Sequence, residues 1–168
     1  DITSVISGKF GNWAGAIRWR EGYLFKNNHI LSVLSGKLKP FDIMMEKTPF
    51  ILTDKLIPGH FGHVAIYLGT PKELQAMNLW NHPSIVPYQK QILQGYNIIE
   101  AVRSGVRLTT LPDFLNIDEI TVIRKNDVTV DSNVQHEIIY RAFDQMGKPY
   151  DFNFDISTLD KIVCSELI

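Results

Sequence analysis

The strongest structural signal in the sequence is the segment HVAIYLG at residues 63–69. Its β-branched and aromatic residues, closed by Gly69, are typical of a β-strand. Both faces of this segment are mostly apolar, which indicates a central position in a sheet. Thr70, Pro71 and Glu73 follow with the spacing of an N-cap, a first helical residue and a capping-box partner. We therefore predict a central strand and a helix that begins near Pro71.

Further segments have the composition of strands: FDIMMEK at 41–47, YNIIEAV at 96–102, GVRLTTL at 105–111 and EITVIRK at 119–125. The chain between them does not show crossover helices at regular spacing. Consecutive strands joined in this way favour antiparallel pairing. We therefore expect an α+β fold in which a small antiparallel sheet packs against helices.

Helices are expected near both ends of the chain. Residues 133–146 carry one apolar stripe, Ser132 and Gln135 have the spacing of a capping box, and Gly147 ends the pattern. The first 39 residues have looser helical spacing interrupted by glycines, which predicts one or two helices there.

The composition excludes several classes of protein. The chain has 168 residues, of which 45% are hydrophobic and 21% charged, as expected for one globular domain. Its net charge is −1 and its acidic and basic residues are interspersed, so we expect neither a nucleic-acid partner nor a basic membrane patch. No apolar run approaches the ~20 residues that a transmembrane helix needs. The single cysteine excludes an internal disulfide and a cysteine-rich zinc site.

That cysteine, Cys164, is a candidate nucleophile. It follows the apolar pair Ile162–Val163 and precedes Ser-Glu-Leu, which can open a helix. Unpaired backbone N–H groups at a helix start lower the pKa of a thiol and can hold an oxyanion. The alternative is a cysteine that only packs in the core, and on this segment alone that alternative is the better explanation.

One of the five histidines, His63, is placed to act as a base. It is the first residue of the predicted central strand and follows Gly62, so its imidazole can face a cleft while its backbone is held in the sheet. His60 lies in the preceding loop and is a weaker candidate. The alternative for His63 is a core histidine bonded to a backbone carbonyl.

Glu100 interrupts an otherwise apolar strand, where a charged side chain needs a partner. If its strand pairs antiparallel with that of His63, a register with Glu100 opposite His63 also places Tyr96 opposite Tyr67, and the carboxylate could then orient the imidazole. The alternative is a strand end turned to solvent. The spacing of histidines and acids matches no metal motif, so we expect no metal and no cofactor.

Three stretches of the sequence resemble the permuted papain-like cysteine hydrolases of the YiiX/YebB/YaeF type, within the NlpC/P60 superfamily. In chain order they are FDIMMEK…LIPGHFGHVAIYLGT, IIEAVRSGVRLTTL and GKPYDFNFD…DKIVCSELI. The resemblance spans residues 40–168. It implies a circularly permuted papain-like fold and a single catalytic domain over residues 1–168, with 1–39 as an N-terminal helical segment outside the resemblance. It also implies that the helix after Cys164 is cut short at Ile168.

The resemblance assigns roles to residues of this sequence. It implies that Cys164 is the nucleophile, His63 the general base and Glu100 the residue that orients the imidazole. Tyr150, in GKPYD, matches a family tyrosine near the active site and is expected to contact substrate or the oxyanion, with packing beneath the sheet as the alternative. Asp42 matches a family turn, with Phe41 in place of the usual glycine, and is expected to be structural.

The implied function is hydrolysis of amide bonds, in cell-wall peptides or related small amides, through an acyl-enzyme. One alternative is a thiol acyltransferase or hydrolase that acts on lipids, and another is a non-catalytic binding module with a vestigial triad. The expected partners are thus peptide, small-amide or lipid substrates. The resemblance suggests the bacterial cell envelope or secretion, with the cytoplasm as the alternative.

Overall fold

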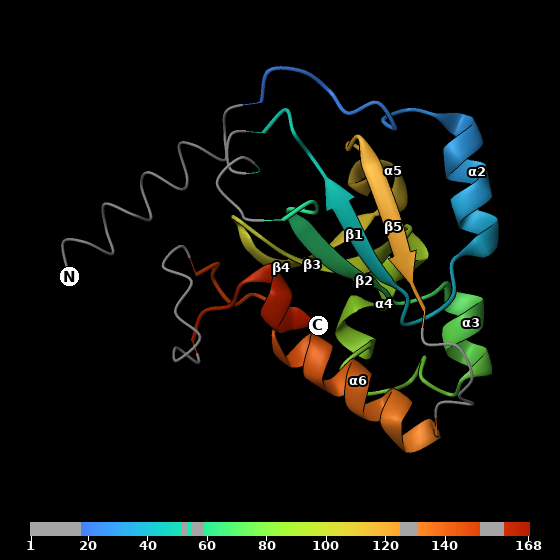
Figure 1. Ribbon diagram of the computed structural model, residues 1–168. Coiled ribbons are helices and arrows are strands. Elements are labelled where there is room, and N and C mark those ends of the chain that lie inside the picture. The colour runs from blue at the N-terminus through green and yellow to red at the C-terminus, as the bar shows by residue number, and fades with distance from the viewer. Residues whose placement is uncertain (1–17, 52–53, 55–58, 125–130, 152–159) are drawn as a thin grey trace.

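Figure 1 shows the computed structural model, which describes residues 18–51, 54, 59–124, 131–151 and 160–168. In this part of the chain the strands are β1 (Ile43–Lys47), β2 (His63–Tyr67), β3 (Tyr96–Val102), β4 (Gly105–Thr110) and β5 (Glu119–Ile123). The α-helices are α2 (Asn28–Lys37), α3 (Pro71–Ala76), α4 (Gln89–Leu93), α5 (Leu111–Phe114) and α6 (Ser132–Asp144). Two 3₁₀ turns are η2 (Val86–Tyr88) and η3 (Cys164–Leu167).

The strands form one sheet in the order β4-β3-β2-β1-β5, and every neighbouring pair is antiparallel. β2 occupies the middle, as its two apolar faces predicted. The strands predicted at 96–102 and 119–125 are β3 and β5, and the latter ends two residues earlier than expected. The predicted α+β class and antiparallel sheet are confirmed.

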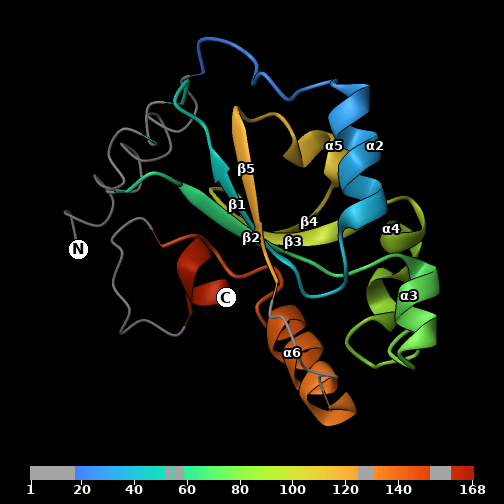
Figure 2. The same ribbon diagram turned by 45° about the vertical axis from the view of Figure 1, so that its right-hand side comes forward.

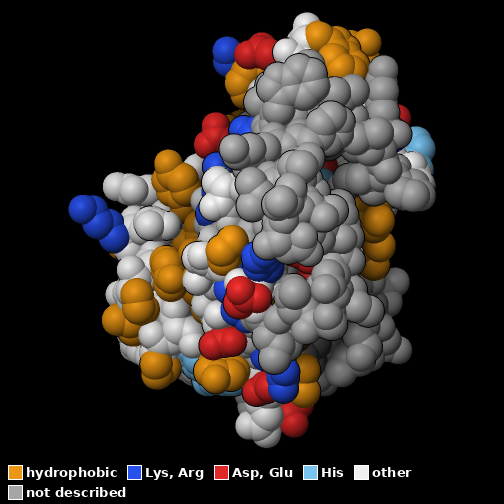
Figure 3. Space-filling model, turned by 90° about the vertical axis from the view of Figure 1, so that its left-hand side faces the viewer, with side chains coloured by type: hydrophobic (Ala, Val, Ile, Leu, Met, Phe, Trp, Pro, Cys, Tyr) orange, Lys and Arg blue, Asp and Glu red, His pale blue; other side chains and the backbone are white. Residues whose placement is uncertain are grey.

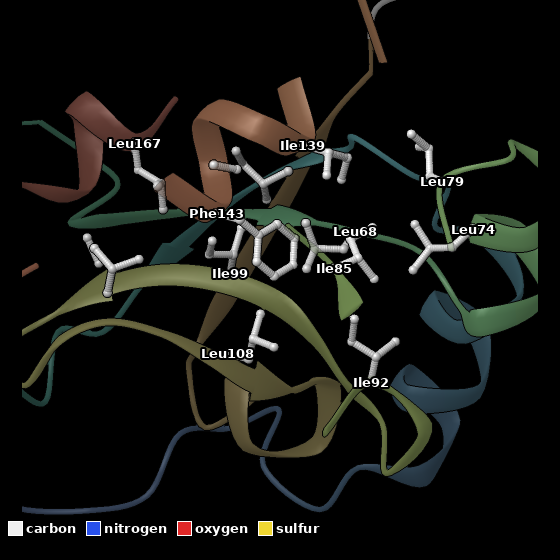
Figure 4. Packing of buried hydrophobic residues seen from close by; sticks show 14 of the residues in the cluster. Leu68, Leu74, Leu79, Ile85, Ile92, Ile99, Leu108, Ile139, Phe143 and Leu167 are labelled. Atoms are coloured by element: carbon white, nitrogen blue, oxygen red, sulfur yellow. The ribbon is translucent and has the colours of Figure 1, made fainter. Parts of the chain in front are cut away.

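Different helices cover the two faces of the sheet (Figures 1 and 2). Side chains alternate along a strand, so Ile66 of β2 joins one core while Ala65 and Tyr67 join the other. The first core contains residues of α3, α4, α6 and η3, and the second contains residues of α5 with α2 packed against it. Figure 4 shows the first core, in which Phe143 of α6 lies near Ile99 of β3.

The helix starts follow from local hydrogen bonds. At α3, Glu73 N–H donates to Thr70 Oγ1 (3.2 Å) and Thr70 N–H donates to Glu73 Oε2 (2.9 Å), which confirms the predicted capping box. At α6 the cap differs from the prediction. Asp131 is the N-cap and accepts from Asn133 N–H at 3.1 Å, so the helix begins one residue before the expected start.

The first 39 residues are described only from residue 18, and they contain α2, whose Asn27 side chain caps it by accepting from Ile30 N–H at 3.1 Å. On the face shown in Figure 3, acidic and basic side chains of the described residues lie beside one another. None of the helices in the described ranges has the length and hydropathy needed to span a bilayer.

Candidate active site

Cys164 lies at the start of η3, which packs against β2 and β3. Leu167 of the same turn is buried in the core, and Val163 N–H donates to Glu166 Oε2 at 2.8 Å, so both ends of this short turn are fixed. The Cys164 side chain is only partly buried. Its sulfur accepts a hydrogen bond from Val64 N–H, next to His63. The turn thus holds the thiol at the first residues of β2.

His63 begins β2 and is 14% exposed at its side chain. Its Nε2 lies 3.2 Å from Glu100 Oε2, and its ring also hydrogen-bonds with Cys164. Because Nε2 faces the carboxylate, Nδ1 is the ring nitrogen left for the thiol. One imidazole therefore connects the sulfur to a carboxylate.

Glu100 is 5% exposed and has both carboxylate oxygens engaged. Oε2 faces His63, while Arg107 of β4 donates to Oε1 from Nε at 3.0 Å and from Nη2 at 2.9 Å. The charged strand residue thus has the partner that its burial requires. Arg107 was not singled out in the sequence, although it is the one charged residue in its strand and lies directly opposite Glu100.

The register expected between β2 and β3 is wrong by two residues. Glu100 lies opposite Ala65, not His63, and Tyr67 lies opposite Ile98, not Tyr96. A shift of two residues keeps every side chain on its face, so Glu100 still shares a face with His63. The two side chains meet diagonally, at a separation that a long side chain such as glutamate can cover.

The electrostatics favour an ion pair between Cys164 and His63. Burial raises the pKa of the Cys164 thiol. This effect is outweighed by the hydrogen bond and charge of His63 and by hydrogen bonds from the Val64 N–H and the Tyr150 hydroxyl, so the pKa of the thiol is lowered. Burial lowers the pKa of His63, but hydrogen bonds to Cys164 and Glu100 and the nearby carboxylates raise it well above its usual value. A thiolate and an imidazolium stabilise each other in this arrangement.

Glu100 remains ionised in this setting. Burial raises its pKa, but the hydrogen bond and charge of His63 and the charge of Arg107 lower it below the ordinary value. An ionised carboxylate at Nε2 holds the imidazole in one orientation and stabilises its protonated form.

Tyr150 lies beside the thiol, where its hydroxyl hydrogen-bonds with Cys164. A short parallel bridge to Ile162 fixes its backbone, with Asp151 N–H donating to Ile162 O at 3.0 Å. Burial and the negative charge of Cys164 raise the pKa of Tyr150, so its hydroxyl stays protonated and available as a donor. The Tyr150 hydroxyl and the Cys164 sulfur therefore lie side by side.

The other sequence candidates lie apart from this cluster. His60 pairs with the exposed Glu119 at 2.8 Å on the rim of β5. Asp42 is fully buried and accepts from Arg124 Nε and Nη2 at 2.6 Å each, an arrangement that ties β1 to the end of β5. Within the described ranges, no three His, Cys, Asp or Glu side chains are grouped so that they could hold a metal ion.

Comparison with known proteins gives one family. Residues 37–168 match the family described as "Permuted papain-like amidase enzyme, YaeF/YiiX, C92 family". Comparisons with curated proteins and with solved structures gave no match. The match covers most of the chain and includes every residue of the cluster around His63. The chain therefore belongs to the permuted papain-like amidases of the YaeF/YiiX family.

Proposed function

We propose that the chain is a cysteine hydrolase that cleaves amide bonds through Cys164, His63 and Glu100. The observation that carries this proposal is the continuous hydrogen-bonded chain from the Cys164 sulfur through the His63 ring to the Glu100 carboxylate. A nucleophile, a base and a group that orients the base are the three parts required for thiol acyl transfer. Membership of an amidase family supports an amide as the bond that is attacked.

In the proposed reaction the Cys164 thiol gives its proton to His63, and the thiolate attacks the amide carbonyl. The C–S bond forms as the carbonyl π-bond opens to an oxyanion. When the tetrahedral intermediate collapses, the C–N bond breaks and the His63 imidazolium protonates the leaving amine. His63 then takes a proton from water, which attacks the thioester and releases the carboxylic acid and the free thiol.

Tyr150 is proposed to contact the substrate or the oxyanion. Its protonated hydroxyl lies at the sulfur, within reach of an atom bonded to that sulfur. A donor at that position stabilises the negative charge that develops on the carbonyl oxygen. We propose cell-wall peptides or related small amides as the substrate class, which rests on the family alone.

A chromogenic acyl donor tests this function without knowledge of the substrate. With p-nitrophenyl acetate, we expect a burst of about one p-nitrophenolate per chain and an acetyl group on Cys164 detected by intact mass. Cys164→Ser and His63→Ala should abolish the burst. Absence of a burst in the wild-type protein, or a burst that persists in Cys164→Ser, would contradict the proposal.

The decay of the acyl-enzyme separates a hydrolase from an acyltransferase. If the protein is a hydrolase, the thioester decays to acetate at a rate that added amines and alcohols leave unchanged. Acceptor-dependent decay, with the acetyl group recovered on the amine or alcohol, would favour transfer instead. The same measurement after incubation with phospholipid would reveal a long-chain acyl adduct on Cys164 if lipids were the substrates.

A further inference from the structure

A second carboxylate, that of Glu46, lies beside His63 on β1, the strand that flanks β2 on the side away from β3. In the β1–β2 pairing Glu46 lies directly opposite His63. Directly opposite residues of an antiparallel pair share one face, with Cβ atoms about 4.5–5.5 Å apart. Glu100 approaches His63 from β3, which is the other neighbour of β2. His63 therefore lies between two carboxylates, one from each flanking strand.

The surroundings of Glu46 give it few compensating charges. Its side chain is partly buried, and the charged groups that face it are His63 from β2, Glu100 from β3, Arg18 from the segment before α2 and Asp54 from the loop after β1. Burial raises the pKa of Glu46 to about 7, the charges of Glu100 and Asp54 add to the rise, and those of His63 and Arg18 oppose it.

Among the described residues, the neighbours of Glu46 on β1 and β5 supply it with no cation. Lys47 points to the other face of β1, as strand alternation requires, and its Nζ pairs with Asp54 at 2.8 Å. On β5 the residue opposite Glu46 is the apolar Ile120. The cation that Glu46 meets within the sheet is thus the imidazolium of His63.

We propose that Glu46 is a second positioning residue for His63, whose ionised carboxylate stabilises the imidazolium that forms when Cys164 gives up its proton. This inference rests on the proposed function, since it requires that proton transfer. Only one proton moves, from the sulfur to the imidazole ring. The charge of Glu46 raises the pKa of His63, whereas Glu46 is not among the principal influences on the pKa of Cys164. Its charge therefore favours the thiolate–imidazolium pair of Cys164 and His63 over the neutral thiol and imidazole.

The two carboxylates then have different tasks. Glu100 is held ionised by His63 and Arg107 and acts as a constant anchor for the imidazole. Glu46 loses its proton close to neutral pH, so its support for the imidazolium increases as the pH rises through about 7. The fraction of Cys164 that is thiolate should therefore increase in the same range.

Alkylation of Cys164 by iodoacetamide measures that fraction, because it is the only thiol in the chain. The second-order rate is followed by intact mass between about pH 5 and pH 8 in the wild type, Glu46→Gln, Glu119→Gln and His63→Ala. Glu119 is the matched control, since it lies on the same sheet in β5 with its side chain 57% exposed and paired with His60. Thermal unfolding of each variant checks that it folds.

The wild type should show an inflection near pH 7. Glu46→Gln should lack this inflection and react about tenfold more slowly at the upper end of the pH range. A tenfold change in rate corresponds to a rise of about one unit in the pKa of the Cys164 thiol. Glu119→Gln should follow the wild type. If Glu46→Gln follows the wild type while His63→Ala is slow, the role of Glu46 is overturned and the triad stands. If His63→Ala also follows the wild type, the proposed triad itself is overturned.

A measurement on the unaltered protein covers the case in which Glu46→Gln does not fold. The carbon-bound ring protons of His63 report nearby charge in an NMR titration. Ionisation of Glu46 should shift these signals near pH 7, separately from the loss of the proton of His63 at higher pH. A titration of His63 with no step near pH 7 would overturn the proposal.

Discussion

Arg107 Nε lies 3.0 Å from Glu100 Oε1, which is the carboxylate oxygen that does not face His63. The two residues are directly opposite in the β3–β4 pairing, so the sheet itself sets their contact. Arg107 thereby holds one carboxylate oxygen and leaves the other for the imidazole.

Arg107→Ala should lower the alkylation rate of Cys164 about three- to tenfold at neutral pH, because the Glu100 carboxylate loses its second anchor. The cost in the free energy of unfolding should be only about 1 kcal/mol, since the Arg107 side chain is 55% exposed. Denaturant unfolding measures the second effect. Arg141→Ala, which removes an exposed pair with Glu137, is the control and should leave the alkylation rate unchanged.

Gly62→Ala should destabilise the protein, which denaturant unfolding measures. A Cβ at this position would meet Asp54 Oδ1 at 2.4 Å, and Asp54 is buried and paired with Lys47. We expect a loss of about 1–3 kcal/mol in the free energy of unfolding. Gly36→Ala is the matched control, because Gly36 lies within α2 and a Cβ at this position would point into open space. That variant should gain about 0.5–1 kcal/mol. Equal effects in the two variants would contradict the steric explanation.

Tyr150→Phe should reduce turnover about ten- to a hundredfold if its hydroxyl contacts the oxyanion or the substrate. The loss of its hydrogen bond to Cys164 should also raise the pKa of the thiol, which the pH profile of alkylation would show. Tyr140→Phe, on the exposed side of α6, serves as the control. Full turnover in Tyr150→Phe would assign this tyrosine to packing alone.

The stability of the fold should depend on the charge of Glu100. Its pKa in the folded protein is lower than its ordinary value of 4.5, so its contribution is present above 4.5 and is lost as the pH falls through the folded-state value. At neutral pH, Glu100→Gln should therefore be less stable than the wild type by about 1–3 kcal/mol. The difference should shrink on acidification below 4.5. A difference that does not change with pH would show that the charge is not responsible.

The bounds of β3 could be predicted from composition, but its register with β2 could not. β3 begins and ends where YNIIEAV does, because its apolar run is bounded by Gly95 and by the turn before Gly105. The alternation of side chains has a period of two, so registers that differ by two residues bury the same side chains. The expected pairing of Glu100 with His63 was therefore indistinguishable in sequence from the observed pairing with Ala65.

Some of the residues around His63 could be identified from their local sequence, and others could not. Cys164 and Glu100 were singled out because an isolated cysteine and a buried acid are conspicuous in their local sequence. Arg107 and Glu46 were not, because each acquires its relation to the site through pairing with a strand distant in the sequence. A charged residue at an inward position of a neighbouring strand is the signal that could have identified both.

The rate at which iodoacetamide labels Cys164 at about pH 6 tests the proposed ion pair most directly, because an ordinary thiol is almost fully protonated there. A Cys164 thiolate stabilised by His63 predicts stoichiometric labelling at least about tenfold faster than that of a free thiol such as glutathione. The same rate in His63→Ala should fall to that of the free thiol. Labelling of the wild type no faster than glutathione, and unchanged in His63→Ala, would contradict the assignment of Cys164 and His63 as nucleophile and base.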